Sequence, residues 1–293
     1  GMGMGGAGGA GRGGGMGSGG MGGSGIDCSA LAAGPFTSEV VVDVFAGSED
    51  FAFDGLGHIV GKANGSIIVA DAGGQTTTLA TNIATAYGMR FFSNGALAVA
   101  LPSLGKVIQV TPSGDVTDIA SGMANVNGVH VDSQDTLWVT QLSQNSVVAK
   151  IPFGGTKQVI LSGNDASGAN GIYLDEERGQ LFYTDYGNGK LRRTDPNNVS
   201  VVDIITIAGA KLDGLAMDAC GNIYAVDQGR SRIFRVQLDA DGNATGPAEM
   251  LAQFPKNVAN ANFGYGDGFD ATKLYVAGNP GTVYSIAVGV PGK

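Results

Sequence analysis

The sequence has little of what identifies membrane proteins, nucleic-acid-binding proteins or helical proteins. It contains no run of about 18 apolar residues, which is the length that a membrane-spanning helix needs. Only 15% of its 293 residues are charged, and the net charge of −9 opposes binding to nucleic acid. No window of about twelve residues has the apolar spacing of an amphipathic helix. These absences favour an all-β protein without a membrane-spanning segment, and they argue against nucleic acid or an anionic membrane surface as the main partner.

Cysteine and histidine are scarce, with two residues of each. A bridge between Cys28 and Cys220 would tie the N-terminal segment to the fifth repeat and suit an oxidising compartment, but two free thiols fit equally well. We expect His58 to lie in an exposed turn. His130 lies three residues after Asn127, so strand alternation turns it away from Asn127 and favours packing between blades. Neither histidine supports a Ser-His-Asp triad.

The first 25 residues differ from the rest, because sixteen of them are glycine and none follows an apolar period. We predict a disordered tether at 1–25, a lead segment at 26–38 and a folded domain at 39–290. Such tethers are common in exported bacterial proteins, so we expect an extracytoplasmic protein that is periplasmic, secreted or lipoprotein-like. The tether could attach the domain to a membrane, although the residues before Cys28 do not form a lipid-attachment site. The alternative is that residues 1–25 are a low-complexity tail without a function. We also expect the protein to be a monomer.

A short phrase of strand, polar turn and strand recurs six times, at intervals of 38 to 49 residues. This period is typical of a propeller blade. The copies begin at Glu49 (EDFAFDGLGHIV), Tyr87 (YGMRFFSNGALAV), Asn127 (NGVHVDSQDTLWV), Asn170 (NGIYLDEERGQLFY), Asp213 (DGLAMDACGNIYAV) and, more loosely, Asn262 (NFGYGDGFDATKLYV).

The number of strands in each repeat indicates how the fold closes. Each of the first five repeats has four candidate strands, the sixth has three, and an unassigned segment of the same type precedes the first repeat at 39–47. The simplest arrangement is a six-bladed β-propeller in which this N-terminal strand completes the last blade. A parallel solenoid is the alternative, but it would not need the extra strand.

In a propeller the opening residues of the six copies would meet around the central channel. Asn-Gly and Asp-Gly pairs also form ordinary turns, but here the turns fall elsewhere in each repeat. Two carboxylates in a narrow channel need a shared proton or a cation. We therefore predict one divalent cation held by Glu49, Asn170 and Asp213, with Asn127 as a fourth ligand or a substrate contact. Oxygen ligands favour calcium, then magnesium or manganese, with zinc also possible.

The phrases EDFAFD, NGVHVD, NGIYLD, DGLAMD and NFGYGDGFDATKLYV resemble the gluconolactonase and senescence marker protein family of six-bladed propellers. Paraoxonases and strictosidine synthases are more distantly similar. The resemblance covers about residues 39 to 288 and implies metal ligands at Glu49, Asn170 and Asp213, with a substrate contact at Asn127. It also implies lactonase activity.

Two positions depart from the patterns of these families. Asn125 stands where lactonases of this kind often have an arginine, which makes sugar-acid lactones less expected as substrates. Tyr87 stands where paraoxonases have a histidine, so their histidine mechanism does not carry over. We expect Tyr87 and Asn125 to contact substrate instead.

These features together predict a metal-dependent hydrolase of a small lactone or ester. Asp213 would act as the base and Glu49 would share in catalysis through the metal. The alternative is a binding propeller without catalysis, similar to NHL propellers, whose cation is structural. Three aspartates that follow second strands are expected to accept loop hydrogen bonds, and the only tryptophan is expected in the core. They are Asp71, Asp185 and Asp227, and the tryptophan is Trp138.

Overall fold

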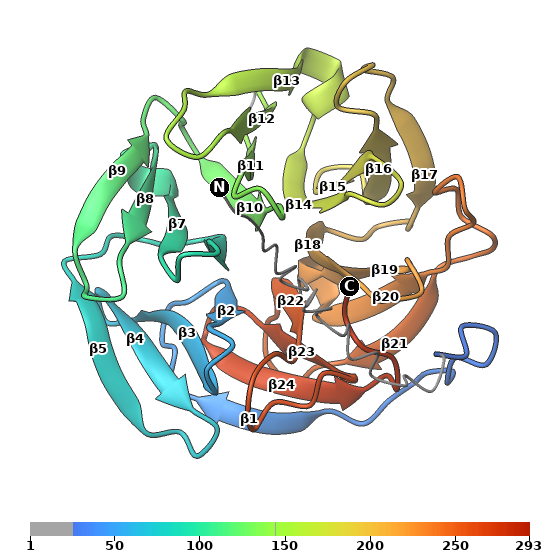
Figure 1. The fold of residues 1–293 in the computed structure, drawn as a ribbon. Helices are drawn as coiled ribbons and strands as arrows, with labels where there is room; N and C mark the ends of the chain where they lie inside the picture. Colours follow the sequence, from blue (N-terminus) through green and yellow to red (C-terminus); the bar gives the residue numbers. More distant parts are fainter. Residues whose placement is uncertain (1–25, 144) are drawn as a thin grey trace, which may run out of the picture.

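The computed structural model describes residues 26–143 and 145–293, and in it the chain forms a ring of six antiparallel sheets (Figure 1). Each sheet has four strands and forms one blade, numbered here in chain order. Blades 1 to 3 contain β2 (Phe51–Phe53), β3 (His58–Ala63), β4 (Ser66–Asp71) and β5 (Thr76–Thr81); β6 (Met89–Phe91), β7 (Leu97–Leu101), β8 (Lys106–Val110) and β9 (Val116–Ala120); and β10 (Val126–Val131), β11 (Leu137–Gln141), β12 (Val147–Ile151) and β13 (Gln158–Ser162). Blades 4 to 6 contain β14 (Ala169–Asp175), β15 (Gln180–Asp185), β16 (Lys190–Thr194) and β17 (Val202–Thr206); β18 (Leu212–Met217), β19 (Ile223–Asp227), β20 (Arg232–Val236) and β21 (Glu249–Gln253); and β22 (Asn260–Phe263), β23 (Lys273–Ala277) and β24 (Thr282–Ala287) with β1 (Glu39–Asp43).

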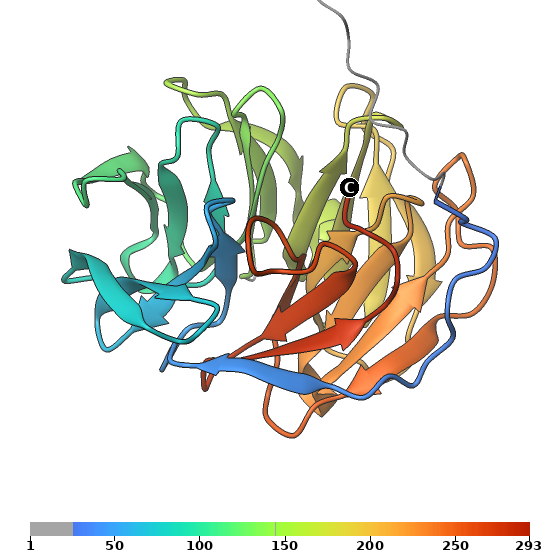
Figure 2. The ribbon, with the colours of Figure 1, turned by 60° about the horizontal axis from the view of Figure 1, so that its bottom comes forward.

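Blade 6 is completed by the N-terminal strand, as the sequence predicts. Strand β1 pairs antiparallel with β24, and Glu39 lies opposite Ser285 in the register. In Figures 1 and 2 the blue β1 lies along the outer edge of the red blade. This pairing covers the edge that β24 would otherwise expose and closes the ring. The six-bladed propeller is therefore confirmed.

The hydrophobic core lies mainly between neighbouring blades. One cluster joins Ile67 of blade 1 to Met89 and Leu97 of blade 2, and all three side chains are fully buried. The strands of each blade are apolar on both faces because each sheet packs against a blade on either side, which explains apolar runs in place of strict alternation. Each blade thus needs both neighbours to bury its surface.

The described residues contain very little helix, which agrees with the absence of helical periodicity in the sequence. Three short 3₁₀ turns occur in loops: η1 (Pro102–Leu104), η2 (Gly163–Ala166) and η3 (Gln228–Arg230). The turn η3 follows β19 directly and ends at Ser231, which has a left-handed φ of 52°. None of the helices found in 26–143 and 145–293 is long and apolar enough to cross a membrane.

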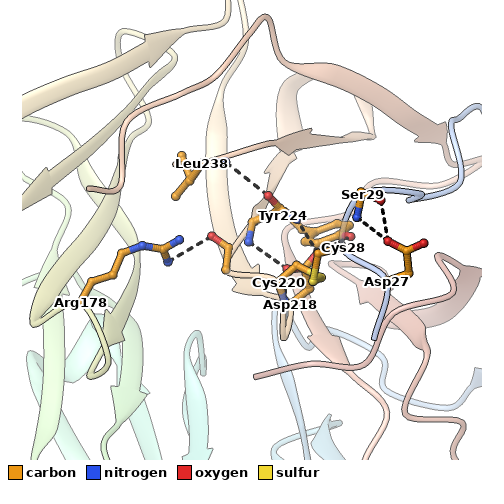
Figure 3. The surroundings of a disulfide bond; sticks show 10 residues. Asp27, Cys28, Ser29, Arg178, Asp218, Cys220, Tyr224 and Leu238 are labelled. Atoms are coloured by element: carbon orange, nitrogen blue, oxygen red, sulfur yellow. Dashed lines mark hydrogen bonds between the residues drawn. A yellow bond between two sulfur atoms is a disulfide. The ribbon is translucent and has the colours of Figure 1, made fainter. Parts of the chain in front are cut away.

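The lead segment at 26–38 is fastened to blade 5. Cys28 forms a disulfide with Cys220, with their Cα atoms 5.6 Å apart (Figure 3). The Phe36 N–H donates to the carbonyl of Leu251 at 2.6 Å, which extends the contact along β21. The structure therefore decides for the bridge, which the sequence left open. The predicted tether at 1–25 lies outside the described residues.

Candidate metal centre

The opening residues of the repeats lie where the innermost strand of each blade begins. Glu49 and Tyr87 each lie two residues before their strands, β2 and β6, whereas Asn127, Asn170 and Asp213 are each the second residue of β10, β14 and β18. The Asn-Gly and Asp-Gly pairs therefore belong to strands and not to turns. Asn127, Asn170 and Asp213 are almost completely buried.

The glycine that follows four of the opening residues, Tyr87, Asn127, Asn170 and Asp213, allows neighbouring innermost strands to approach closely. The Gly88 N–H donates to the carbonyl of Asn127 at 3.0 Å, and a Cβ on Gly88 would lie 2.6 Å from that oxygen. The Gly171 N–H donates to Thr184 Oγ1 at 2.8 Å, and that hydroxyl donates to the carbonyl of Asp213 at 2.6 Å. These contacts link Asn127 and Asp213 to the preceding blade, so a side chain at Gly88 or Gly171 would push the ring apart.

Four buried oxygen atoms of this ring have no hydrogen-bond partner. They are Glu49 Oε2, Asn127 Oδ1, Asn170 Oδ1 and Asp213 Oδ1. Buried polar atoms are almost always hydrogen-bonded, so four unpartnered acceptors from four blades need an explanation. When the two carboxyls are ionised, each of the four oxygens accepts but does not donate, so none can satisfy another, whereas a cation could satisfy all four.

Burial and mutual repulsion raise the pKa values of the two ring carboxyls, Glu49 and Asp213. Burial raises the pKa of Glu49 to about 7, against the lowering effect of a hydrogen bond from Gln228. Burial raises the pKa of Asp213 well above its ordinary value, and the charge of Glu49 raises it further. Burial and the charges of these two carboxyls also raise the pKa of the Tyr87 hydroxyl. Glu49, Tyr87 and Asp213 thus share one electrostatic environment.

The donor set fits a hard divalent cation. Two carboxylates and two amide oxygens are the ligands that calcium, magnesium and manganese prefer, and neither thiol nor imidazole is among them. Within 26–143 and 145–293, no group of three or more His, Cys, Asp or Glu side chains is placed to hold a metal ion. The fit therefore depends on the two asparagines, Asn127 and Asn170, as much as on the two acids.

The sixth position of the ring differs from the sequence prediction. The Gly214 N–H donates to the carbonyl of Ala259 at 2.8 Å, in the way that the Gly88 N–H donates to Asn127. Ala259 is therefore the equivalent residue, and the assignment of Asn262 to the ring is wrong. The Asn262 side chain donates to the carbonyl of Phe51 at 2.8 Å and joins blade 6 to blade 1. No side chain of blade 6 contributes an oxygen at this ring position.

Sequence reasoning missed two polar side chains beside Glu49. Gln228 Nε2 donates to Glu49 Oε1 at 3.1 Å, and the Tyr186 hydroxyl donates to Gln228 Oε1 at 2.8 Å. Each follows an aspartate that ends a second strand, Asp227 and Asp185. Tyr186 and Gln228 thus hold equivalent positions, each directly after the second strand of its blade. This equivalence was the signal in the sequence that could have identified them, because the residue after a second strand lies near the channel mouth.

Asp50, next to Glu49, was also missed. It takes the place that glycine has in the next four repeats and is fully buried. Its carboxylate accepts hydrogen bonds from the Met89 N–H at 2.9 Å and from Arg90 Nη1 at 2.7 Å. The positive charge of Arg90 therefore compensates the charge of Asp50, a third carboxylate close to the ring. Because Asp50 is already hydrogen-bonded to blade 2, we do not count it among the cation ligands.

The remaining candidates lie away from the four oxygens or have structural roles. Asn125 is exposed and has a left-handed φ of 53°, and its carbonyl accepts a hydrogen bond from the Leu142 N–H. His130 packs against Tyr173 of the next blade, with ring centres 4.5 Å apart, which confirms packing between blades. His58 is the first residue of β3, so the turn predicted for it is wrong, but its side chain is 41% exposed, as predicted, and bonds Asp54 at 2.7 Å.

The three aspartates predicted to follow second strands organise loops, but Asp71 ends β4, the third strand of blade 1, so the position predicted for it is wrong. Asp71 and Asp185 accept the backbone N–H groups of Gln75 and Asn188 in the loops that follow, as expected. Asp227 instead accepts the N–H of Lys211, which precedes β18. Trp138 is buried, as predicted, and its indole nitrogen donates to Asp132 at 2.9 Å.

Comparison with known proteins shows the family. A sequence model of the SMP-30/gluconolactonase/LRE-like region matches residues 51–278, which is most of the chain. The chain belongs to this family. The resemblance inferred from the repeated phrases is therefore confirmed. No curated protein matches the chain.

Solved structures of similar fold include relatives of several kinds. A gluconolactonase from Xanthomonas campestris is 14% identical, with a TM-score of 0.70, over 88% of this chain and 90% of that chain. Regucalcin, a calcium-binding protein from Agrobacterium tumefaciens, is 17% identical, with a TM-score of 0.69, over 90% and 98%. A luciferin-regenerating enzyme is 16% identical, with a TM-score of 0.70, over 88% and 97%. At sequence identities of 14–17%, these similarities establish the fold alone.

Proposed function

We propose that this member of the SMP-30/gluconolactonase family is a divalent-cation-dependent hydrolase that cleaves a small lactone or ester at the Glu49 end of the channel. The single observation that carries the proposal is the set of four buried, unpartnered oxygens from four blades. Membership of the family and the similarity to a gluconolactonase and to a calcium-binding protein support the same chemistry.

Glu49, Asn127, Asn170 and Asp213 would hold the cation, with calcium as the first choice. When bound, the cation would polarise the substrate carbonyl and stabilise the charge that develops on its oxygen. The buried position of the ring excludes bulk water and strengthens each electrostatic contact inside it.

Asp213 is the proposed general base. It would accept a proton from the attacking water while the water oxygen bonds to the carbonyl carbon. The carbon–oxygen bond of the lactone or ester then breaks, and the proton passes to the departing alkoxide, so atoms and charge balance. Tyr87, whose raised pKa keeps its hydroxyl protonated, would donate a hydrogen bond to the substrate.

The disulfide supports an extracytoplasmic location, which is the second part of the proposal. Cysteine bridges persist in oxidising compartments such as the periplasm or the exterior. Measuring free thiols in protein from intact cells, with alkylation before lysis, tests this directly. Free Cys28 and Cys220 in that measurement would contradict it.

The first test of the activity is metal content by elemental analysis of protein purified without chelator. We expect about one divalent ion per chain. A Glu49→Ala/Asp213→Ala double variant should lose it. An Asp241→Ala/Asp267→Ala double variant, which removes two exposed carboxylates elsewhere, should keep it. A screen of lactones and aryl esters with a pH indicator then measures turnover.

The outcomes separate the proposal from its alternative. Turnover that is lost on chelation and in Asp213→Ala supports the hydrolase. A tightly held cation without turnover of any lactone or ester would favour a binding propeller with a structural cation. Protein without a divalent ion, even after incubation with calcium, would contradict the metal centre itself.

A further inference from the structure

One side chain reaches Glu49 from a blade that is not its neighbour. Gln228 belongs to blade 5, and its Nε2 donates to Glu49 Oε1 at 3.1 Å across 179 residues of sequence. Blade 6 lies between the two and has only Ala259 at its ring position. Among the residues that the structure describes, Gln228 is the one side-chain donor to Glu49.

The Gln228 amide is itself fixed at its other end. Its Oε1 accepts a hydrogen bond from the Tyr186 hydroxyl at 2.8 Å, which sets the direction of the amide because that hydroxyl donates. The backbone of Gln228 is held as well, since its N–H donates to the Lys211 carbonyl and its carbonyl accepts from Asn257 Nδ2 at 3.0 Å. Tyr186, Gln228 and Glu49 thus form one directed chain over blades 4, 5 and 1.

The Tyr186–Gln228–Glu49 hydrogen bonds give the two carboxylate oxygens of Glu49 different surroundings. Oε1 is occupied by the Gln228 amide, whereas Oε2 is buried and unpartnered, together with the oxygens of Asn127, Asn170 and Asp213. A hydrogen bond to one carboxylate oxygen fixes the rotation of the group and therefore which oxygen faces the ligand.

We propose that Gln228 and Tyr186 are positioning residues for the cation: Gln228 fixes the Glu49 carboxylate with Oε2 toward the site, and Tyr186 fixes Gln228. This inference rests on the proposed cation site and assigns two residues that neither the repeated phrase nor the carboxylate ring contains. Tyr186 acts only through Gln228, so the two residues form an ordered pair.

The test is calcium binding by titration calorimetry on chelator-stripped protein, which does not depend on turnover. Gln228→Ala should weaken calcium binding about 10- to 100-fold, the range measured when such supporting contacts are removed. Tyr186→Phe, which removes one hydroxyl, should weaken it less. The double variant should bind no more weakly than Gln228→Ala alone, because the second residue acts through the first.

Two controls separate positioning from damage to the fold. Gln180→Ala removes a side-chain amide of the same kind that donates to the Asp241 carbonyl, away from the ring, so calcium affinity should stay within about twofold of the parent. Thermal unfolding in chelator should remain a single cooperative transition in all variants, which shows that the fold is intact. If Gln228→Ala unfolds, Gln228→Met keeps the length of the side chain without its amide, and the same loss of affinity is expected.

Three results would overturn the inference, and they differ from one another. If Gln228→Ala and Tyr186→Phe bind calcium like the parent while Glu49→Ala does not, the cation site stands and the positioning role is wrong. If the two losses multiply in the double variant, Tyr186 does not act through Gln228 and the ordered chain is wrong. If the parent itself binds no calcium, magnesium or manganese, the proposed function fails and the positioning role fails with it.

Discussion

Protonation of Glu49 should control how the stability of the metal-free protein depends on pH. Burial raises the pKa of this carboxyl from 4.5 to about 7 in the folded protein. Between these values the folded state keeps a proton that the unfolded state has lost, so the free energy of unfolding falls as the pH rises. The stabilisation is complete below about pH 4.5 and is lost above about pH 7. At about 1.4 kcal/mol per pH unit, the loss is about 3 kcal/mol.

The assay is urea unfolding of the parent and of Glu49→Gln, both in chelator, from about pH 4.5 to about pH 8. Subtracting the variant from the parent cancels the titration of distant groups, and what remains belongs to Glu49 and to Asp213, which is coupled to it. Calcium should then stabilise the parent more at pH 8 than at pH 5, because its ligands must be ionised. A parent-minus-variant difference that stays within about 0.5 kcal/mol over the whole range would refute this reasoning.

Two further predictions concern the lead segment and the ring glycines. Replacing Cys28 and Cys220 with serine should lower the free energy of unfolding by about 2–4 kcal/mol in urea, and a parent that is equally stable with and without reductant would contradict this. Gly171→Ala should weaken calcium binding at least about tenfold, because its Cβ would press on the Asp213 carbonyl. Gly246→Ala is the control, because a Cβ at Gly246 would meet open space, and its calcium affinity by calorimetry should equal that of the parent. Equal calcium affinities for the Gly171→Ala and Gly246→Ala variants would show that the close approach at Gly171 does not matter.

The sequence was sufficient for the parts of the molecule that depend on local repetition. Asn127, Asn170 and Asp213 could be aligned because each opens a phrase with a glycine after it and a short turn before the second strand. The sixth copy lacks that pair and has a longer turn, at 264–272 between β22 and β23. Because of this longer turn, the sixth copy could be aligned only loosely, and the sequence prediction placed Asn262 at the ring position that Ala259 holds in the structure.

Contacts between distant blades could not be predicted in the same way. Gln228 of blade 5 reaches Glu49 of blade 1 past blade 6, and no periodic pattern in the sequence shows which loop residue bends toward the channel. The pairing of Cys28 with Cys220 was open for a related reason, because the path of 26–38 along blade 5 depends on tertiary contacts such as the one from Phe36 to Leu251. The burial that raises the Glu49 pKa also exists only once the ring has closed.

The pairing of β1 with β24 sets an order of events during synthesis. Five blades consist of strands that follow one another along the chain, so each can form soon after it leaves the ribosome. Blade 6 needs a strand that was made first and must stay unpaired until β24 arrives, and such long-range pairing is slow. A circular permutant that places 39–47 after β24 would make all six blades local. It should therefore refold faster and spend less time with an open edge.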